Sequence, residues 1–190
     1  NKKRNERSKR NVKNGCIWHF WFYVNAFNSF FNRGDINIMN VSDEGFELIK
    51  NFEGCELTAY KCAAGVWTIG YGHTKDVQED DVWSEEKADF MLFRELEEEY
   101  EDYVNSLVQV PINQCQFDAL CSWVYNLGPA NLKSSTLLKK LNAGEYEDIP
   151  NQIKRWNKAT VNGERKVLPG LTRRREAEAL MFEGKPWEHI

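Results

Sequence analysis

Three side chains with different proton chemistry fall within residues 52–74, FEGCELTAYKCAAGVWTIGYGHT. Glu53 offers a carboxyl group, Cys62 a thiol nine residues later, and Thr68 a hydroxyl six residues after the thiol. Glu53 ends a helical pattern and a glycine-rich stretch with strand character follows, so a helix and a hairpin would place the three groups around one cleft. Such a set suits a reaction that needs a proton donor and a positioned water or nucleophile.

The helix that must position Glu53 is predicted to begin at Ser42, a suitable N-cap, and to stop at Gly54. Its apolar residues recur at three-residue spacing: Phe46, Ile49 and Phe52. Glu53 then lies in the last turn, where the negative end of the helix and the aromatic neighbours favour a protonated carboxyl group. A lone glutamate at a helix end is commonly a solvated surface residue, but the spacing to the thiol and the hydroxyl favours a catalytic role.

Residues 57–74 are predicted to form strands with turns around 63–65 and 70–72, because the stretch 66–69 has high β-propensity and glycines follow it. His73 has no second histidine at ligand spacing, so a hydrogen-bonded structural imidazole is the better interpretation than a metal ligand or a base. The five cysteines lack the close C-x2-C spacing of zinc sites. We therefore expect neither a metal nor a cofactor.

Residues 84–190 are predicted to be mostly helical. Ser84 begins a long predicted helix, residues 84–110, with one apolar face and one acidic face that we interpret as solvated. The acids of that face are Glu95, Glu97, Glu98, Glu99, Glu101 and Asp102. After Pro111 come short helices, one of which Asn113 is expected to cap and another of which is expected to follow Gly170. A hairpin is predicted around residues 162–163. These elements indicate an α+β fold with a small helix-plus-hairpin lobe (39–83), a linking helix (84–110) and a mainly helical lobe (111–190).

Residues 1–38 differ from the remainder in charge and composition. They hold eight Lys or Arg against two acids, whereas the whole chain of 190 residues carries a net charge of −4. The acidic remainder argues against a nucleic-acid-binding module, which would present a basic face. The aromatic run 16–31 follows the basic residues in the order of a signal anchor, but it is shorter than the roughly 20 residues of a spanning helix. An upstream extension with Met39 as the working start, or an extra helix, are the alternatives.

The stretch around Glu53 closely resembles the catalytic signature of the phage-type lysozymes, the endolysins of glycoside hydrolase family 24. That signature is a catalytic Glu followed by Gly, then an Asp or Cys, then a Thr, and Glu53, Cys62 and Thr68 match its spacing. Later segments match family motifs in the family's order: QFDAL (116–120), STLL (135–138), GL (170–171) and RRRE (173–176). The resemblance covers roughly residues 39–190 and leaves the first 38 unexplained.

The resemblance implies a lysozyme-like fold and hydrolysis of the β-1,4 link between N-acetylmuramic acid and N-acetylglucosamine in peptidoglycan, leading to host cell lysis. Glu53 would protonate the leaving oxygen, while Cys62 and Thr68 would place the water. Much of the family has Asp where Cys62 stands, and a free thiol is mostly protonated at neutral pH. The substitution leaves inverting or retaining chemistry open. It also leaves two alternative functions open. One is a wall-binding or virion-associated module with weakened catalysis, and the other is a structural protein with a vestigial cleft.

The resemblance further implies a monomer that is made in the bacterial host cytoplasm and acts on the cell wall in the periplasm. Some family members are held at the membrane by a weakly hydrophobic N-terminal segment and are activated on release. Residues 16–31 are the candidate for such transient membrane association. Cys55 and Cys62 flank a strand and a turn and could pair in an oxidising periplasm, and Cys16 could then exchange with Cys55. Cys115 and Cys121 are expected to be ordinary buried residues.

Overall fold

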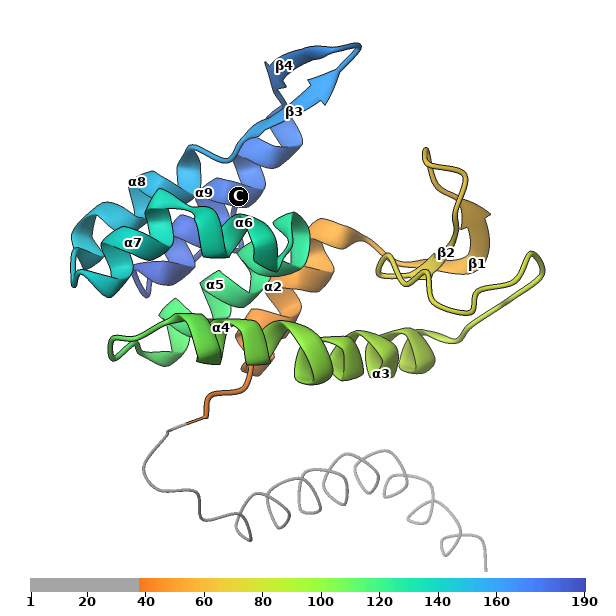
Figure 1. Ribbon diagram of the computed structural model, residues 1–190. Helices are drawn as coiled ribbons and strands as arrows, with labels where there is room; N and C mark the ends of the chain where they lie inside the picture. Colours follow the sequence, from red (N-terminus) through yellow and green to blue (C-terminus); the bar gives the residue numbers. More distant parts are fainter. Residues whose placement is uncertain (1–37) are drawn as a thin grey trace, which may run out of the picture. The chain divides into compact units, whose positions relative to one another are not determined.

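Helices and two short hairpins make up residues 38–190, the part of the chain that this computed structural model describes, and these residues form one compact unit. Figure 1 shows their arrangement. In chain order the elements are α2 (Asp43–Glu53), β1 (Glu56–Lys61), β2 (Trp67–Gly70), α3 (Glu85–Glu95), the π-helical turn η1 (Leu96–Tyr100), α4 (Glu101–Leu107), α5 (Gln114–Leu127), α6 (Pro129–Ser134), α7 (Thr136–Asn142), the 3-10 turn η2 (Tyr146–Asp148), α8 (Ile149–Lys154), β3 (Lys158–Val161), β4 (Glu164–Val167) and α9 (Pro169–Phe182).

Side-chain caps fix where several helices begin, as the sequence predicted. Ser42 accepts a hydrogen bond from the amide of Gly45 at the start of α2, and Ser84 accepts one from the amide of Lys87 at the start of α3. Asn113 forms a reciprocal capping box with Gln116 at the start of α5. Because α2 begins at a fixed residue, its last turn, which carries Glu53, is fixed as well.

The first hairpin pairs β1 and β2 in antiparallel fashion, with Tyr60 opposite Thr68. The pairing shifts between Glu56 and Tyr60, which is the signature of a bulge. On its other edge β1 meets a short segment after the hairpin through a bridge between Thr58 and Val82. This neighbour and the packing of β2 on the helices hold the hairpin on both sides.

The long predicted helix is present but not uniform. It runs through α3, η1 and α4 and ends at Leu107, and η1 inserts a wide turn that changes which residues share a face. The prediction that the acidic face of this helix is solvated was therefore wrong in part. Glu101 is only 4% exposed and accepts hydrogen bonds from the Val41 amide (2.8 Å) and the Asn40 side chain (2.7 Å), and Glu95 contacts His73.

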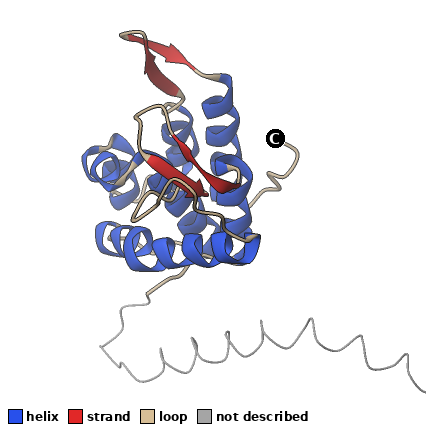
Figure 2. Ribbon diagram, turned by 90° about the vertical axis from the view of Figure 1, so that its right-hand side faces the viewer, coloured by secondary structure: helices blue, strands red, loops and turns tan. Residues whose placement is uncertain are grey.

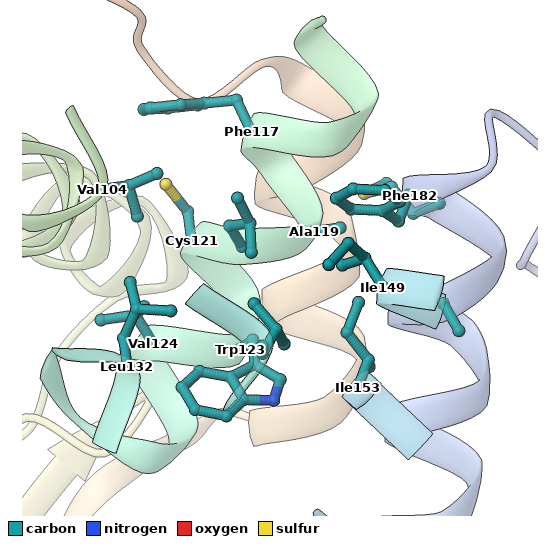
Figure 3. Close-up of a cluster of buried hydrophobic side chains, with 14 of the residues drawn as sticks. Val104, Phe117, Ala119, Cys121, Trp123, Val124, Leu132, Ile149, Ile153 and Phe182 are labelled. Atoms are coloured by element: carbon teal, nitrogen blue, oxygen red, sulfur yellow. The ribbon is translucent and has the colours of Figure 1, made fainter. Parts of the chain in front are cut away.

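The larger hydrophobic core lies where α5 is surrounded by the other helices (Figure 3). Trp123 is fully buried in α5, and its ring meets that of Trp156 edge-on at a centroid distance of 4.9 Å. Other buried members include Val104, Phe117, Cys121, Val124, Leu132, Ile149, Ile153 and Phe182. Cys121 is thus an ordinary buried residue, whereas Cys115 is only partly buried.

A second, smaller core lies under the first hairpin. Ile69 of β2 packs there with Ile49 of α2 and Leu92 of α3. A hydrogen bond from the Tyr125 hydroxyl to the carbonyl of Tyr71 (2.9 Å) connects this core to α5. The observed α+β architecture has the small hairpin region, the long helix and the mainly helical region that the sequence predicted.

The second hairpin, β3–β4, turns at Asn162 and Gly163, which both have positive φ, as the predicted two-residue hairpin requires. Figure 2 shows it extending beyond the helices. The helix that follows it, α9, begins at Pro169, so the expectation that Gly170 precedes this helix was wrong by a short distance. Proline is favoured at a first helical position because its missing amide has no partner there.

The expectations for residues 1–37, namely the extension or signal anchor, the aromatic run 16–31 and the role of Cys16, lie outside the described residues. From Ile38 onward, no helix is both long and apolar enough to cross a membrane.

Candidate active site

Glu53 ends α2 at the boundary of two cavities. Gly54 follows it with a φ of 71° and turns the chain toward β1. One cavity, of about 480 Å³, extends from Glu53 toward His73, Glu95 and Tyr125. The other, of about 580 Å³, extends toward Leu168, Arg173 and the C-terminus. A carboxyl group at this boundary can reach a ligand that occupies either cavity.

Arg174 of α9 holds the carboxyl group of Glu53. Its Nη1 lies 2.5 Å from Glu53 Oε1, and the side chain of Arg174 is only 3% exposed whereas that of Glu53 is 20% exposed. The guanidinium also donates from Nε to Glu178 Oε1 (3.1 Å) and from Nη2 to the carbonyl of Ser122 (3.2 Å). The contacts with Glu178 and Ser122 therefore fix the orientation of the Arg174 guanidinium, and its Nη1 contacts Glu53.

The charges behind Glu53 form a buried cluster. Glu178 is fully buried and contacts both Arg174 and Arg175, and it also accepts a hydrogen bond from Ser122. Burial lowers the pKa of the Arg175 guanidinium, and the charge of Glu178 opposes this shift. Two buried cations thus face one buried carboxylate, and Glu53 contacts this cluster from its partly exposed side.

Cys62 and Thr68 lie together in the first hairpin. Hydrogen bonds from the backbone of Val66 and Ala64, and from the Thr68 side chain, lower the pKa of the Cys62 thiol. The Thr68 hydroxyl is 3.1 Å from the carbonyl of Val66 and is almost fully buried. The turn 62–66 therefore surrounds the sulfur with donors, an environment that stabilises a thiolate.

The predicted site residues thus fall into two groups. Cys62 and Thr68 are in contact, whereas Glu53 is placed by α2 and Arg174 and shares no hydrogen bond with either of them within residues 38–190. Helix and hairpin are joined directly at Gly54 and Cys55. A substrate that spans both groups would complete the arrangement.

The predicted pairing of Cys55 with Cys62 is not compatible with this conformation. Both cysteines are free, and the whole of β1 lies between them. An extended strand of that length separates its ends by roughly 15–20 Å, whereas disulfide-bonded cysteines have Cα atoms within about 7 Å. A bond between them would require β1 to leave its pairing with β2.

His73 forms one wall of the first cavity. Its Nδ1 lies 2.5 Å from Glu95 Oε1, and its Nε2 lies 2.8 Å from the carbonyl oxygen of Lys75. Glu95 also accepts a hydrogen bond from the Tyr125 hydroxyl (3.3 Å), and burial raises the pKa of Tyr125 well above its ordinary value. The imidazole is hydrogen-bonded at both nitrogens, in agreement with the structural interpretation of His73.

Sequence reasoning missed Arg174, Glu178 and Tyr125. The signal for Arg174 was the four-residue spacing to Glu178 on a predicted helix, which places opposite charges on one face. Tyr125 gave no signal, because its contact with Glu95 joins two separate helices. No cluster of three or more His, Cys, Asp or Glu side chains suited to a metal ion occurs in the described part of the chain.

Comparison with known proteins places this site in a family. The family described as "Phage lysozyme" matches residues 50–178. The endolysin of Acyrthosiphon pisum secondary endosymbiont phage 1 is 46% identical over 145 residues, which cover 76% of this chain and 99% of that protein. The endolysin of Salmonella phage P22 is 38% identical over 150 residues, with coverage of 76% and 99%.

A solved structure agrees with these sequence relatives. The muramidase domain of SpmX from Asticaccaulis excentricus superimposes with a TM-score of 0.72 at 38% identity, covering 75% of this chain and 97% of that domain. The sequence match includes both Glu53 and Arg174, and the structural match confirms the lysozyme-like α+β fold. The chain belongs to the phage lysozyme family.

Proposed function

We propose that this protein is a muramidase of the endolysin type that hydrolyses the β-1,4 link between N-acetylmuramic acid and N-acetylglucosamine in bacterial peptidoglycan. The observation that carries the proposal is the placement of Glu53, a partly exposed carboxyl group that a buried arginine holds at the boundary of two cavities. A polysaccharide chain has to extend on both sides of the bond that is cut, and two cavities meeting at Glu53 suit this need. The endolysin relatives act on the cell wall, and peptidoglycan is the corresponding substrate.

In the proposed reaction Glu53 is the general acid. It gives its proton to the glycosidic oxygen as the bond to the anomeric carbon breaks, and it becomes a carboxylate. Arg174 stabilises that carboxylate at the moment it forms, because the guanidinium is already in contact with Oε1. Glu178 acts as a positioning residue, since its contact with Arg174 Nε holds the guanidinium in place.

Cys62 and Thr68 supply the second half of the reaction. Hydrogen bonds lower the pKa of the Cys62 thiol, which favours the thiolate at the position where much of the family has aspartate. A thiolate there stabilises positive charge at the anomeric carbon and orients the attacking water. The Thr68 hydroxyl, which contacts both the thiol and the Val66 carbonyl, fixes the direction of that group.

The test is hydrolysis of purified peptidoglycan by the wild-type protein and by Glu53→Gln. We expect Glu53→Gln to lower the rate about 1,000-fold, because it removes the transferable proton while keeping the shape of the side chain. Glu47→Gln is the matched control, since Glu47 lies in the same helix with its side chain 65% exposed, and it should retain full activity. Products with muramic acid at the new reducing end identify the bond.

Two outcomes would contradict the proposal. Activity of Glu53→Gln within a few-fold of wild type would remove Glu53 from the role of general acid. Wild-type protein that binds peptidoglycan without releasing reducing ends would instead indicate the wall-binding alternative, which the replacement of aspartate by Cys62 favours.

We also propose that the protein is exported and associates transiently with the membrane through residues 16–31, and that it acts as a monomer. The support is the sequence order, a basic run followed by an aromatic run. Membrane fractionation of the full chain beside a chain that begins at Met39 tests this. Equal recovery of both chains in the soluble fraction would argue against it.

A further inference from the structure

The base of the second hairpin concentrates positive charge. Of the 17 Lys and Arg residues between Ile38 and Ile190, eight fall within residues 154–175, where the only acid is Glu164, and six of the eight lie outside the buried pair Arg174 and Arg175. The described part of the chain is otherwise acidic, with 27 Asp and Glu residues in total. A local excess of cations on an acidic protein attracts anionic groups to one place on its surface.

Some of these cations have protein partners and others do not. Lys154 pairs with Glu176 (2.8 Å) and Lys166 pairs with Glu164 (3.0 Å). In contrast, Lys158 and Arg165 have no ion pair with any residue from 38 to 190, and Arg155 contacts only the neutral side chain of Gln152 (3.3 Å). Arg155, Lys158 and Arg165 therefore carry positive charge that no carboxylate in residues 38–190 compensates.

The three uncompensated cations line one pocket. Arg155, Asn157, Lys158 and Arg165 surround a volume of about 440 Å³, and no carboxylate is among the lining residues. Placing like charges around a common space is unfavourable unless an anion occupies it. Arginine guanidinium groups bind carboxylates and phosphates with two parallel hydrogen bonds, and the Asn157 amide adds a neutral donor.

The pocket lies next to the cavity that contains Glu53. The amide of Leu168, at the end of the hairpin, donates to the carbonyl of Asn157 (3.0 Å), and Leu168 itself lines the Glu53 cavity. Arg173 also lines that cavity. A ligand in the Glu53 cavity that carries a branch can therefore reach the basic pocket past Leu168.

We propose that this pocket binds a carboxylate of the peptide stem that peptidoglycan carries on its muramic acid residues. The inference rests on the proposed function, because it takes the substrate to be peptidoglycan. The stem is attached to the sugar beside the bond that is cut, and its carboxylates match the charge and the hydrogen-bond donors of the pocket. The β3–β4 hairpin would thus recognise the peptide while the first hairpin and Glu53 act on the sugar.

The experiment compares kcat/KM on two substrates: intact peptidoglycan, and the same glycan strands after an amidase has removed the stem peptides. The variant is Lys158→Gln combined with Arg165→Gln. Its matched control is Lys166→Gln, which removes a cation from the same hairpin outside the pocket. We expect the double variant to be about tenfold slower than wild type on intact peptidoglycan, to match wild type on bare strands, and to unfold at the same temperature. The control should match wild type on both.

Other results would overturn the inference. Equal rates of wild type and double variant on intact peptidoglycan would remove the pocket from substrate binding, even though wild-type hydrolysis would uphold the proposed function. Equal impairment on both substrates would mean that the pocket acts on the glycan or on stability. Loss of binding to vesicles of anionic phospholipid, with the peptidoglycan rate unchanged, would assign the pocket to phosphate instead. No hydrolysis by wild type would defeat the proposed function itself.

Discussion

The two hairpins of this protein have similar lengths and opposite environments. In β1–β2, three of the four residues of β2 are buried and the hairpin covers a hydrophobic core. In β3–β4, no residue of either strand is buried, and only the base of the hairpin meets the helices. The difference indicates a division of roles, because a packed hairpin can hold catalytic groups in a fixed geometry and an exposed hairpin presents its side chains to a ligand.

The sequences of the strands explain the difference. Strand β2 is WTIG, with Ile69 and the buried Thr68, and a Cβ at Gly70 would lie 3.2 Å from the ring of Trp83. Strand β4 is ERKV and offers almost no apolar surface to a core. The Asn-Gly turn favours the observed antiparallel pairing of β3 with β4.

The largest expected effect concerns stability. Ile69→Ala should lower the free energy of unfolding by about 3 kcal/mol, because it leaves a cavity in the smaller core. Val161→Ala should change it by less than about 0.5 kcal/mol, because Val161 is 37% exposed in β3. Urea denaturation measures both. Similar losses for the two variants would mean that the second hairpin is packed as firmly as the first.

The next effect concerns catalysis in the first hairpin. Cys62→Ala should reduce peptidoglycan hydrolysis about 100-fold, because it removes a thiol whose lowered pKa favours negative charge beside Thr68. Cys62→Asp should be tolerated, because a carboxylate restores both charge and hydrogen bonding. Initial rates of turbidity loss of a peptidoglycan suspension measure the activity of both variants. A wild-type rate for Cys62→Ala would mean that Cys62 has no role in catalysis.

The smallest effect concerns the reactivity of the two thiols around β1. Hydrogen bonds lower the pKa of Cys62, whereas partial desolvation of the sulfur, together with the negative charges of Asp89 and Glu85, raises the pKa of Cys55. Because only the thiolate reacts, an alkylating reagent should modify Cys62 several times faster at neutral pH, although Cys55 is the more exposed residue.

The same pair of thiols gives a pH dependence with a defined sign. At high pH both thiols are ionised and the rates should converge, so the ratio of Cys62 to Cys55 labelling should rise as the pH falls from about 10 to about 7. Peptide mass spectrometry after timed alkylation measures this ratio. Faster labelling of Cys55 throughout that range would show that the turn 62–66 does not stabilise a thiolate.

Local sequence rules predicted the elements whose cause is local. The caps at Ser42, Ser84 and Asn113, the stop at Gly54 and the turn at Asn162 each depend on neighbours within a few residues, and the structure has them all. The cap at Ser42 and the stop at Gly54 together set the position of Glu53. The fold class followed from the order of such elements and from the family resemblance.

Contacts between distant segments were not predictable in the same way. Arg174 meets Glu53 across 121 positions of sequence, and the buried state of Glu101 depends on the chain around Val41. The π-helical turn η1 also has no local signature, and it changed which acids of the long helix face solvent. Sequence periodicity gives the face of a regular helix only as long as the helix stays regular.

The chain just before α2 has a mechanical consequence. Met39 exchanges two hydrogen bonds with the side chain of Asn105, and Glu101 accepts one hydrogen bond from the Asn40 side chain and one from the Val41 amide. Tension applied to the chain upstream of Met39 would be borne first by these hydrogen bonds to α4, before it reaches α2. The helix that carries Glu53 is thus insulated from pulling at the N-terminal side, and its last turn can keep its geometry under load.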